Sequence, residues 1–126
     1  MFPYQDSKLP VEERVEDLLA RMTLREKILQ TDQYFSGDFT TQDENCLVTA
    51  MDENRLDELL NGFSVGSIQL RGMDAAQANA VQRYALEKTR LGIPFLFSEE
   101  ALHGLMTGKA TSFPQQIGLA ATFHPA

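Results

Sequence analysis

One stretch of sequence decides the fold of this chain: GIPFLFSEEALHG, residues 92–104. It opens with a Gly-Ile-Pro turn, continues through the apolar run at residues 95–97 and then presents two adjacent carboxylates, Glu99 and Glu100. An apolar run without polar alternation is typical of a strand that is covered on both faces in a parallel sheet. The stretch therefore predicts a buried strand with acidic side chains at its carboxyl end.

The residues upstream supply a matching strand and a connecting helix. The run VGSIQL at residues 65–70 predicts a second short apolar strand, and Asp74 is placed to cap a helix before the Gly92 turn. The apolar face of that helix consists of Ala75, Ala78, Val81, Ala85 and Leu86. Together these elements predict a right-handed βαβ unit, which places the strand ends at Arg71 and at residues 98–100 on one face of a parallel sheet. The fold class is therefore α/β, and ligands are expected at that face.

The amino-terminal half is expected to be mainly helical. Residues 7–32 carry an apolar stripe with helical spacing, and the capping-box sequence at Thr23 predicts that the helix stops and restarts there. The restarted helix is expected to bury Leu24, Ile28 and Leu29. Residues 31–46 are rich in Asp, Gln, Thr and Gly, which predicts a long irregular connection. A short helix over residues 52–60 follows and is ended by an Asn-Gly pair.

The composition argues against several classes of function. The 126 residues carry 11 basic and 18 acidic side chains, a net charge of −7, so we expect no nucleic acid as a partner. No apolar run approaches the roughly 18 residues of a membrane helix, and no signal peptide is visible, so we expect no membrane partner. The single Cys46 excludes an internal disulfide, which fits the cytoplasm and fits equally a periplasmic or secreted enzyme whose leader has been removed. With only His103 and His124 as histidines, we expect neither a metal nor another cofactor.

The two glutamates after the apolar run at 95–97 are the leading candidates for chemistry. A carboxylate at the carboxyl end of a strand can accept hydrogen bonds from a polyhydroxylated ligand or act as an acid or base. Because side chains alternate along an extended chain, at most one of Glu99 and Glu100 faces such a ligand. The alternative is a pair of solvated surface charges. Arg71 likewise either faces the site or is a surface charge.

Three other patterns do not support a function. Glu100 and His103 have the Glu-x-x-His spacing of di-iron proteins, but no second such pair exists, so His103 is expected to form local hydrogen bonds and shape the turn that follows. Residues 104–110 resemble a phosphate-binding loop, but the spacing is one residue short, and Lys109 is expected to be a solvated charge. No G-x-S-x-G elbow is present and Cys46 has no neighbouring base, which argues against a Ser or Cys nucleophile.

Three separated blocks of the chain resemble the amino-terminal domain of family 3 glycoside hydrolases. They are LPVEERVEDLLARMTLREK at residues 9–27, GIPFLFSEEALHG at 92–104 and ATSFPQQIGLAATF at 110–123. The resemblance implies the amino-terminal portion of a (β/α)₈ barrel preceded by a helical segment, usually followed by a second α/β domain. Such a barrel needs on the order of 250 residues. Residues 1–126 are therefore expected to be a partial barrel domain that depends on the remainder of the same polypeptide or associates with itself.

The resemblance also implies an activity. It points to a retaining, exo-acting β-glucosidase or β-xylosidase that removes terminal non-reducing sugars from β-linked oligosaccharides and glycosides. An Asp nucleophile forms a glycosyl–enzyme and a Glu acts as acid/base, with the two carboxyl groups about 5–5.5 Å apart. The family's nucleophile, acid/base and sugar-binding Lys-His pair would lie beyond Ala126, so this chain alone is expected to be inactive.

One functional residue of the family transfers to this sequence. The resemblance places Glu100 at the acidic position three residues before the His-Gly of a family motif, where the side chain binds sugar hydroxyls in the −1 subsite. His103 and Arg71 are supporting candidates. Many glucosidases of the family have Asp at the Glu100 position, and the longer Glu would crowd a hexose C6 hydroxymethyl group, so we expect a preference for xylosides with glucosides still open. The alternative function is a non-catalytic chain that acts by sugar binding or protein association.

Overall fold

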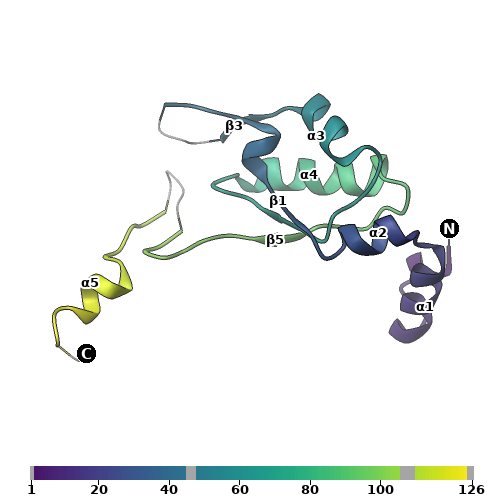
Figure 1. The fold of residues 1–126 in the computed structure, drawn as a ribbon, viewed down its shortest axis with the longest axis horizontal. Coiled ribbons are helices and arrows are strands. Elements are labelled where there is room, and N and C mark those ends of the chain that lie inside the picture. Colours follow the sequence, from purple (N-terminus) through teal and green to yellow (C-terminus); the bar gives the residue numbers. More distant parts are fainter. Residues whose placement is uncertain (1, 45–47, 106–109, 125–126) are drawn as a thin grey trace.

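The computed structural model describes residues 2–44, 48–105 and 110–124 as a mixed α/β chain (Figure 1). Its helices are α1 (Val11–Arg21), α2 (Leu24–Leu29), α3 (Glu53–Leu60), α4 (Ala75–Lys88) and α5 (Gln116–Ala120). Its strands are β1 (Gln33–Phe35), β2 (Thr40–Gln42), β3 (Val48–Met51), β4 (Ser67–Gln69) and β5 (Leu96–Ser98). Two short 3-10 helices are η1 (Pro3–Gln5) and η2 (Ser36–Asp38). None of the helices in these ranges is long and apolar enough to cross a membrane.

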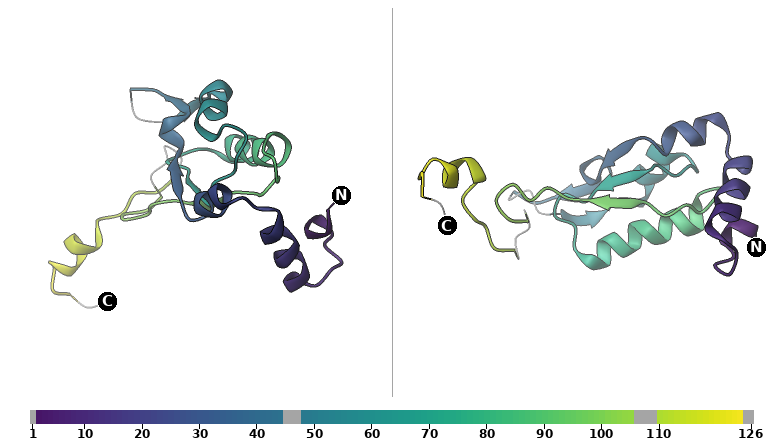
Figure 2. Two further views of the ribbon diagram at one scale, coloured as in Figure 1. Left: turned by 45° about the vertical axis from the view of Figure 1, so that its right-hand side comes forward. Right: turned by 90° about the horizontal axis from the view of Figure 1, so that it is seen from below.

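The centre of the fold is a parallel three-stranded sheet with the strand order β1-β4-β5. Its register places Ile68 of β4 between Tyr34 of β1 and Phe97 of β5. Helix α4 connects β4 to β5 and runs along one face of the sheet (Figure 2). The two predicted strands are therefore confirmed as parallel neighbours joined by a helix, and β1 adds a third strand that the sequence did not predict.

Side-chain hydrogen bonds to the backbone fix both ends of this β4-α4-β5 unit. At its start, the carboxylate of Asp74 accepts the N–H of Gln77 at 2.9 Å, which confirms the predicted helix cap. At its end, the side-chain amide of Gln82 donates to the carbonyl of Phe95 and accepts the N–H of the same residue, both at 2.9 Å. The beginning of β5 is thus held by α4 as well as by β4.

Helices α3 and α4 share a hydrophobic core with the sheet. The phenol of Tyr84 on α4 donates to Asp57 on α3 at 2.5 Å, and burial together with this hydrogen bond raises the pKa of the phenol. Helix α3 lies where it was predicted, capped by Asp52 at its start and by a left-handed Asn61 at its end. Leu86, which was predicted on the apolar face of α4, is exposed. The buried core residues are Phe39, Leu56, Leu60, Val65, Ile68, Met73, Val81, Tyr84, Ala85 and Phe95.

The helix break predicted at Thr23 is confirmed, but the buried face predicted after it is largely wrong. Thr23 and Glu26 form the capping box of α2. Leu24 and Ile28 are 74% and 59% exposed, and only Leu29 is partly buried. Helix α2 instead turns the carboxylate of Glu26 inward, where an ion pair with a residue beyond α4 holds it. The face of α2 that is buried is therefore the one that carries Glu26, and the local apolar pattern does not reveal this charged contact.

The long irregular connection predicted for residues 31–46 is wrong. This segment contains β1, η2 and β2, and β2 pairs antiparallel with β3. Strands of three residues are too short to show an alternating pattern, and the pairing partner of β1 lies far along the chain in β4. Cys46, and Lys109 of the loop compared with phosphate-binding loops, lie outside the described residues.

Strand β5 lies at one edge of the sheet, so the full burial predicted for residues 95–97 is wrong. Phe95 is buried, whereas Leu96 is 74% exposed. Successive side chains of a strand point to opposite faces, and the described residues leave Leu96 uncovered. Further on, residues 111–124 are exposed throughout, and α5 lies apart from the sheet in Figures 1 and 2.

Candidate functional site

Hydrogen bonds join the carboxyl ends of the three parallel strands. The buried hydroxyl of Ser36, directly after β1, donates to the carbonyl of Leu70, directly after β4, at 2.5 Å. The N–H of Leu70 in turn donates to the carbonyl of Ser98, the last residue of β5, at 3.1 Å. The strand ends at Arg71 and at residues 98–100 therefore meet on one face, as predicted.

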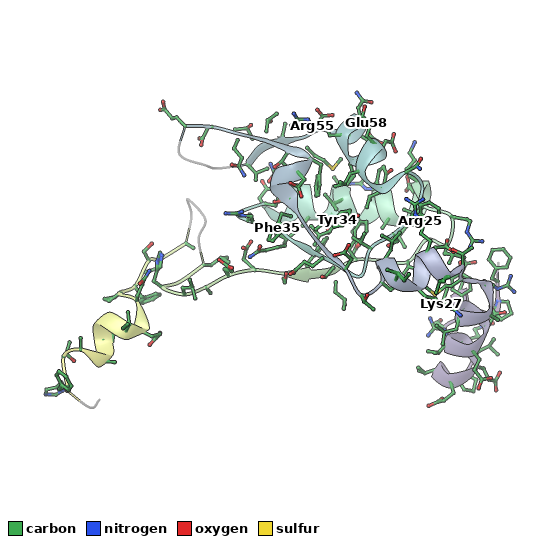
Figure 3. All side chains as sticks on the ribbon, in the orientation of Figure 1. Arg25, Lys27, Tyr34, Phe35, Arg55 and Glu58 are labelled. Atoms are coloured by element: carbon green, nitrogen blue, oxygen red, sulfur yellow. The ribbon has the colours of Figure 1, made fainter. Side chains whose placement is uncertain are left out.

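A tight turn follows β4 at this face. Arg71 and Gly72 have positive φ angles of 48° and 87°. A positive φ is uncommon for a residue with a side chain. The guanidinium of Arg71 lies over the ring of Phe35, which is labelled in Figure 3, at 5.9 Å from the ring centre. The structure thus brings Arg71 to the face where the strands end, with its guanidinium over the last residue of β1.

The two glutamates after β5 lie in different surroundings. The partly buried carboxylate of Glu99 accepts the N–H of Gly72 through Oε2 and the N–H of Glu100 through Oε1, both at 3.1 Å. Glu100 is exposed and lines an open hollow of about 610 Å³ between the end of β5 and the start of α5. The hollow is lined by Glu99, Glu100, Ala101, Leu102, Gln115, Gln116 and Ile117. A ligand in this hollow would find the carboxylate of Glu100 unshielded and that of Glu99 already bound to the backbone.

The turn after the glutamates is held through the backbone of His103. The carbonyl of His103 accepts the N–H of Phe113 at 2.6 Å. Gly104 has a φ of 95°, and a Cβ atom at this position would lie only 2.2 Å from the carbonyl oxygen of Thr111. This main-chain hydrogen bond links the end of the glutamate segment to the segment that leads into α5, and the local hydrogen bonding expected of the His103 side chain stays a prediction.

Sequence reasoning misses two contributors to this face. Ser36 lies in the segment that was predicted to be irregular, and a single polar residue after a three-residue strand gives no recognisable pattern. The hydrogen bond between Glu99 and Gly72 joins residues that are 27 positions apart, so no local sequence pattern predicts it. Within residues 2–44, 48–105 and 110–124, no group of three or more His, Cys, Asp or Glu side chains is arranged to hold a metal ion.

Comparison with known protein families decides the assignment. The family model described as "Glycosyl hydrolase family 3 N terminal domain" matches residues 23–126. The chain belongs to glycoside hydrolase family 3. The matched range contains all three parallel strands and the whole of the candidate site, and this agrees with the resemblance seen in the three sequence blocks.

Two curated relatives of this family 3 chain carry glycosidase names. A putative β-xylosidase of Formosa agariphila is 30% identical over 97% of this chain and 16% of the relative. A periplasmic β-glucosidase/β-xylosidase of Dickeya chrysanthemi is 35% identical over 94% of this chain and 20% of the relative. The chain therefore spans about a fifth or less of the length of these relatives.

A solved structure is also similar to this family 3 chain. It is a β-glucosidase from Listeria innocua in complex with glucose, with a TM-score of 0.49 and 28% sequence identity. The similarity covers 74% of this chain and 13% of the solved chain.

Proposed function

We propose that this family 3 chain is the part of a retaining, exo-acting β-glycosidase that holds the terminal sugar in the −1 subsite through Glu100. The observation that carries the proposal is the position of Glu100, which follows β5 at the carboxyl ends of the parallel strands and lines the hollow. Ligands of parallel α/β folds bind at this end of the sheet. In the complete enzyme, residues 1–126 would be part of an amino-terminal (β/α)₈ barrel, with Arg71 and His103 as supporting residues.

The chemistry of a carboxylate suits this role. An ionised carboxylate accepts hydrogen bonds from two sugar hydroxyls more strongly than a neutral acceptor does. A site built to bind particular hydroxyls discriminates against sugars that lack them. Because Glu is one methylene longer than Asp, the carboxylate of Glu100 would reach further into the hollow and leave less room for the C6 hydroxymethyl group of a hexose. We therefore propose that the site prefers β-xylosides to β-glucosides.

Replacing Glu100 with alanine is expected to abolish most of the sugar affinity of the chain. Xylose is titrated into the ¹⁵N-labelled chain, and the amide shifts of residues around the hollow are followed by NMR. Hydrogen bonds to a charged group contribute about 1.5–3 kcal/mol, so Glu100→Ala should raise the Kd at least about tenfold. Glucose should bind the unmodified chain more weakly than xylose.

Glu58→Ala is the matched control for this experiment. Glu58 is an exposed glutamate on α3, and Figure 3 shows it on the opposite side of the molecule from α5. Its removal changes the net charge equally and should leave the Kd unaltered. Equal xylose affinity of the Glu100→Ala chain and the unmodified chain would overturn the assignment of Glu100, and tighter binding of glucose would overturn the xyloside preference.

Residues 1–126 alone are expected to release no product from aryl β-xylosides and aryl β-glucosides. The retaining mechanism requires a nucleophile and an acid/base about 5–5.5 Å apart. We propose that both lie outside these residues, since the curated relatives are much longer than the region they share with this chain. A chromogenic assay checks this, and turnover comparable to that of a complete family 3 enzyme would contradict it.

A second candidate function is association with another protein chain. Exposed apolar side chains at the edge strand and along the carboxyl-terminal segment favour it, with Leu96 74%, Ile117 79% and Phe123 92% exposed. Sedimentation over a range of concentrations separates the two candidates. A stable oligomer without any sugar-dependent shift would favour association, and a sugar-binding monomer would favour the glycosidase role.

A further inference from the structure

We infer that Glu99 is a positioning residue that fixes the backbone of Glu100 and joins it to the Arg71–Gly72 turn, so that the Glu100 carboxylate is held toward the hollow. This inference rests on the proposed function for the meaning of the hollow. Its structural part, the restraint of two backbone segments by one carboxylate, stands on hydrogen bonds that are independent of any sugar.

The first step is the arrangement of hydrogen bonds at Glu99. Each of its two carboxylate oxygens accepts one backbone N–H: Oε2 accepts from Gly72, and Oε1 accepts from Glu100, both at 3.1 Å. Bonds from N–H groups to an ionised carboxylate are stronger than those between neutral groups. One planar group therefore fixes the distance between the turn after β4 and the first sugar-facing residue after β5.

The second step is the conformation of the turn that Glu99 holds. Arg71 has a φ of 48°, although it has a side chain, and Gly72 follows with a φ of 87°. A residue with a side chain remains in this region only where its surroundings impose it, and such residues cluster at functional sites. The Gly72 N–H that emerges from the turn is the one that Glu99 accepts. The contacts of Glu99 at one end and of the Arg71 guanidinium with Phe35 at the other restrain the turn.

The third step is the effect on Glu100. Both glutamates line the hollow, but the carboxylate of Glu99 is held against the backbone of the turn, so the carboxylate of Glu100 is the one left available to a ligand. Without the Glu99 bonds, the segment after β5 would lose its restraint to the turn, and the carboxylate of Glu100 would sample positions away from the sugar. Misplacement of a binding group by about 1 Å is enough to reduce function strongly.

Two variants of Glu99 test the inference. Glu99→Ala removes both acceptors, whereas Glu99→Gln keeps the size of the side chain and one acceptor oxygen, so one of the two N–H groups loses its partner. Glu58→Ala again controls for the change in charge. Each ¹⁵N-labelled chain is checked for folding by its NMR spectrum and then measured in two ways, by hydrogen exchange of the Gly72 and Glu100 amides and by titration with xylose.

The expected result is a graded loss that is specific to Glu99. In Glu99→Ala both amides should exchange roughly tenfold faster or more, and the Kd for xylose should rise about three- to tenfold. Glu99→Gln should lie between Glu99→Ala and the unmodified chain, and Glu58→Ala should match the unmodified chain. A role of Glu99 in general stability alone would instead accelerate exchange at amides throughout the sheet by the same factor.

The two readouts separate failure of this inference from failure of the proposed function. Unchanged exchange of Gly72 and Glu100 in a folded Glu99→Ala or Glu99→Gln chain overturns the positioning role, whether or not sugar binds. Unchanged xylose affinity in the Glu99 variants, with affinity lost in Glu100→Ala, overturns the link from Glu99 to binding. If the unmodified chain shows no shift with xylose or glucose, the proposed sugar site fails, and the exchange data alone decide whether Glu99 restrains Glu100.

Discussion

Replacing Gly66 with alanine is expected to remove a large part of the folding stability of the chain. A Cβ atom at residue 66 would lie 2.0 Å from the carbonyl oxygen and 2.7 Å from the carbonyl carbon of Gln30, at the end of α2. These are backbone atoms that no side-chain rotation can move. The Gly66 N–H donates to the carbonyl of Leu29 at 2.9 Å, and its own carbonyl accepts the N–H of Leu96 at 3.0 Å. The backbone therefore cannot retreat without separating α2 from the start of the sheet.

Gly66→Ala is expected to lower the free energy of unfolding by more than about 4 kcal/mol, an effect that few single substitutions reach. Small domains are stable by only about 5–15 kcal/mol. Urea titration followed by circular dichroism measures the effect. Gly118→Ala is the matched control, because a Cβ atom at this position in α5 meets no atom within 4 Å, and alanine favours helix more than glycine does. Equal urea midpoints for the two variants would contradict the prediction.

Removing the guanidinium of Arg90 is expected to cause the second largest loss of folding stability. Its Nε and Nη2 atoms donate to Oε1 and Oε2 of Glu26 at 2.8 and 2.5 Å, and the Glu26 side chain is only 4% exposed. Glu26 also accepts the N–H and the hydroxyl of Thr23, and Arg90 donates to the carbonyls of Arg21 and Gly62. Arg90→Ala would leave a buried carboxylate without its cation. Since the Arg90 side chain is 48% exposed and therefore partly screened by water, we expect a loss of about 2–3 kcal/mol rather than the full effect of a buried pair.

The same ion pair makes the effect depend on pH. The hydrogen bonds from Arg90, with further ones from Thr23, lower the pKa of Glu26 from 4.5 to about 2 despite its burial. A lowered pKa in the folded state means that the unfolded chain binds more protons between these values. The contribution of Glu26 is therefore fully present above pH 4.5 and is lost as the pH falls toward 2. The difference in stability between the unmodified chain and Arg90→Ala should narrow over that interval.

Urea midpoints at several pH values between 7 and 2 measure this difference. Arg55→Ala is the control, because its ion pair with Asp52 spans 3.9 Å and its side chain is 59% exposed. Exposed pairs of this kind contribute little, so the midpoint of Arg55→Ala should stay close to that of the unmodified chain. An equal loss for both arginine variants, or a difference that does not change with pH, would show that Glu26 and Arg90 do not act as described.

The elements that the sequence predicts correctly are those with a local chemical signal. The Thr23–Glu26 capping box, the Asp74 cap and the left-handed Asn61 mark helix ends within a few residues of themselves. Two of the features that it misses depend on partners far along the chain. Strand β1 is defined by its pairing with β4, and α2 turns its Glu26 face inward, toward a residue 64 positions away, rather than Leu24 or Ile28.

The candidate site divides in the same way. The apolar run at residues 95–97 predicts that the two glutamates lie at the carboxyl end of a strand, and they directly follow β5. That only one of them faces a ligand stays a prediction, since both line the hollow. The contact between Glu99 and Gly72 follows from the approach of two strand ends and from the positive φ angles of the turn. No short sequence motif encodes the approach of the strand ends or the conformation of the turn. The contact of Glu99 with Gly72 is therefore visible only in the structure.

The two hydrogen bonds between Gln82 and Phe95 oppose a shift in the register of β5. A shift of β5 by one residue would break both bonds at once. Such a slip turns every side chain of a strand to the opposite face. Here it would displace the segment that carries Glu99 and Glu100, and with it the contact between Glu99 and Gly72. A helix residue beside the start of β5 thus helps to fix the position of the two carboxylates that follow its end.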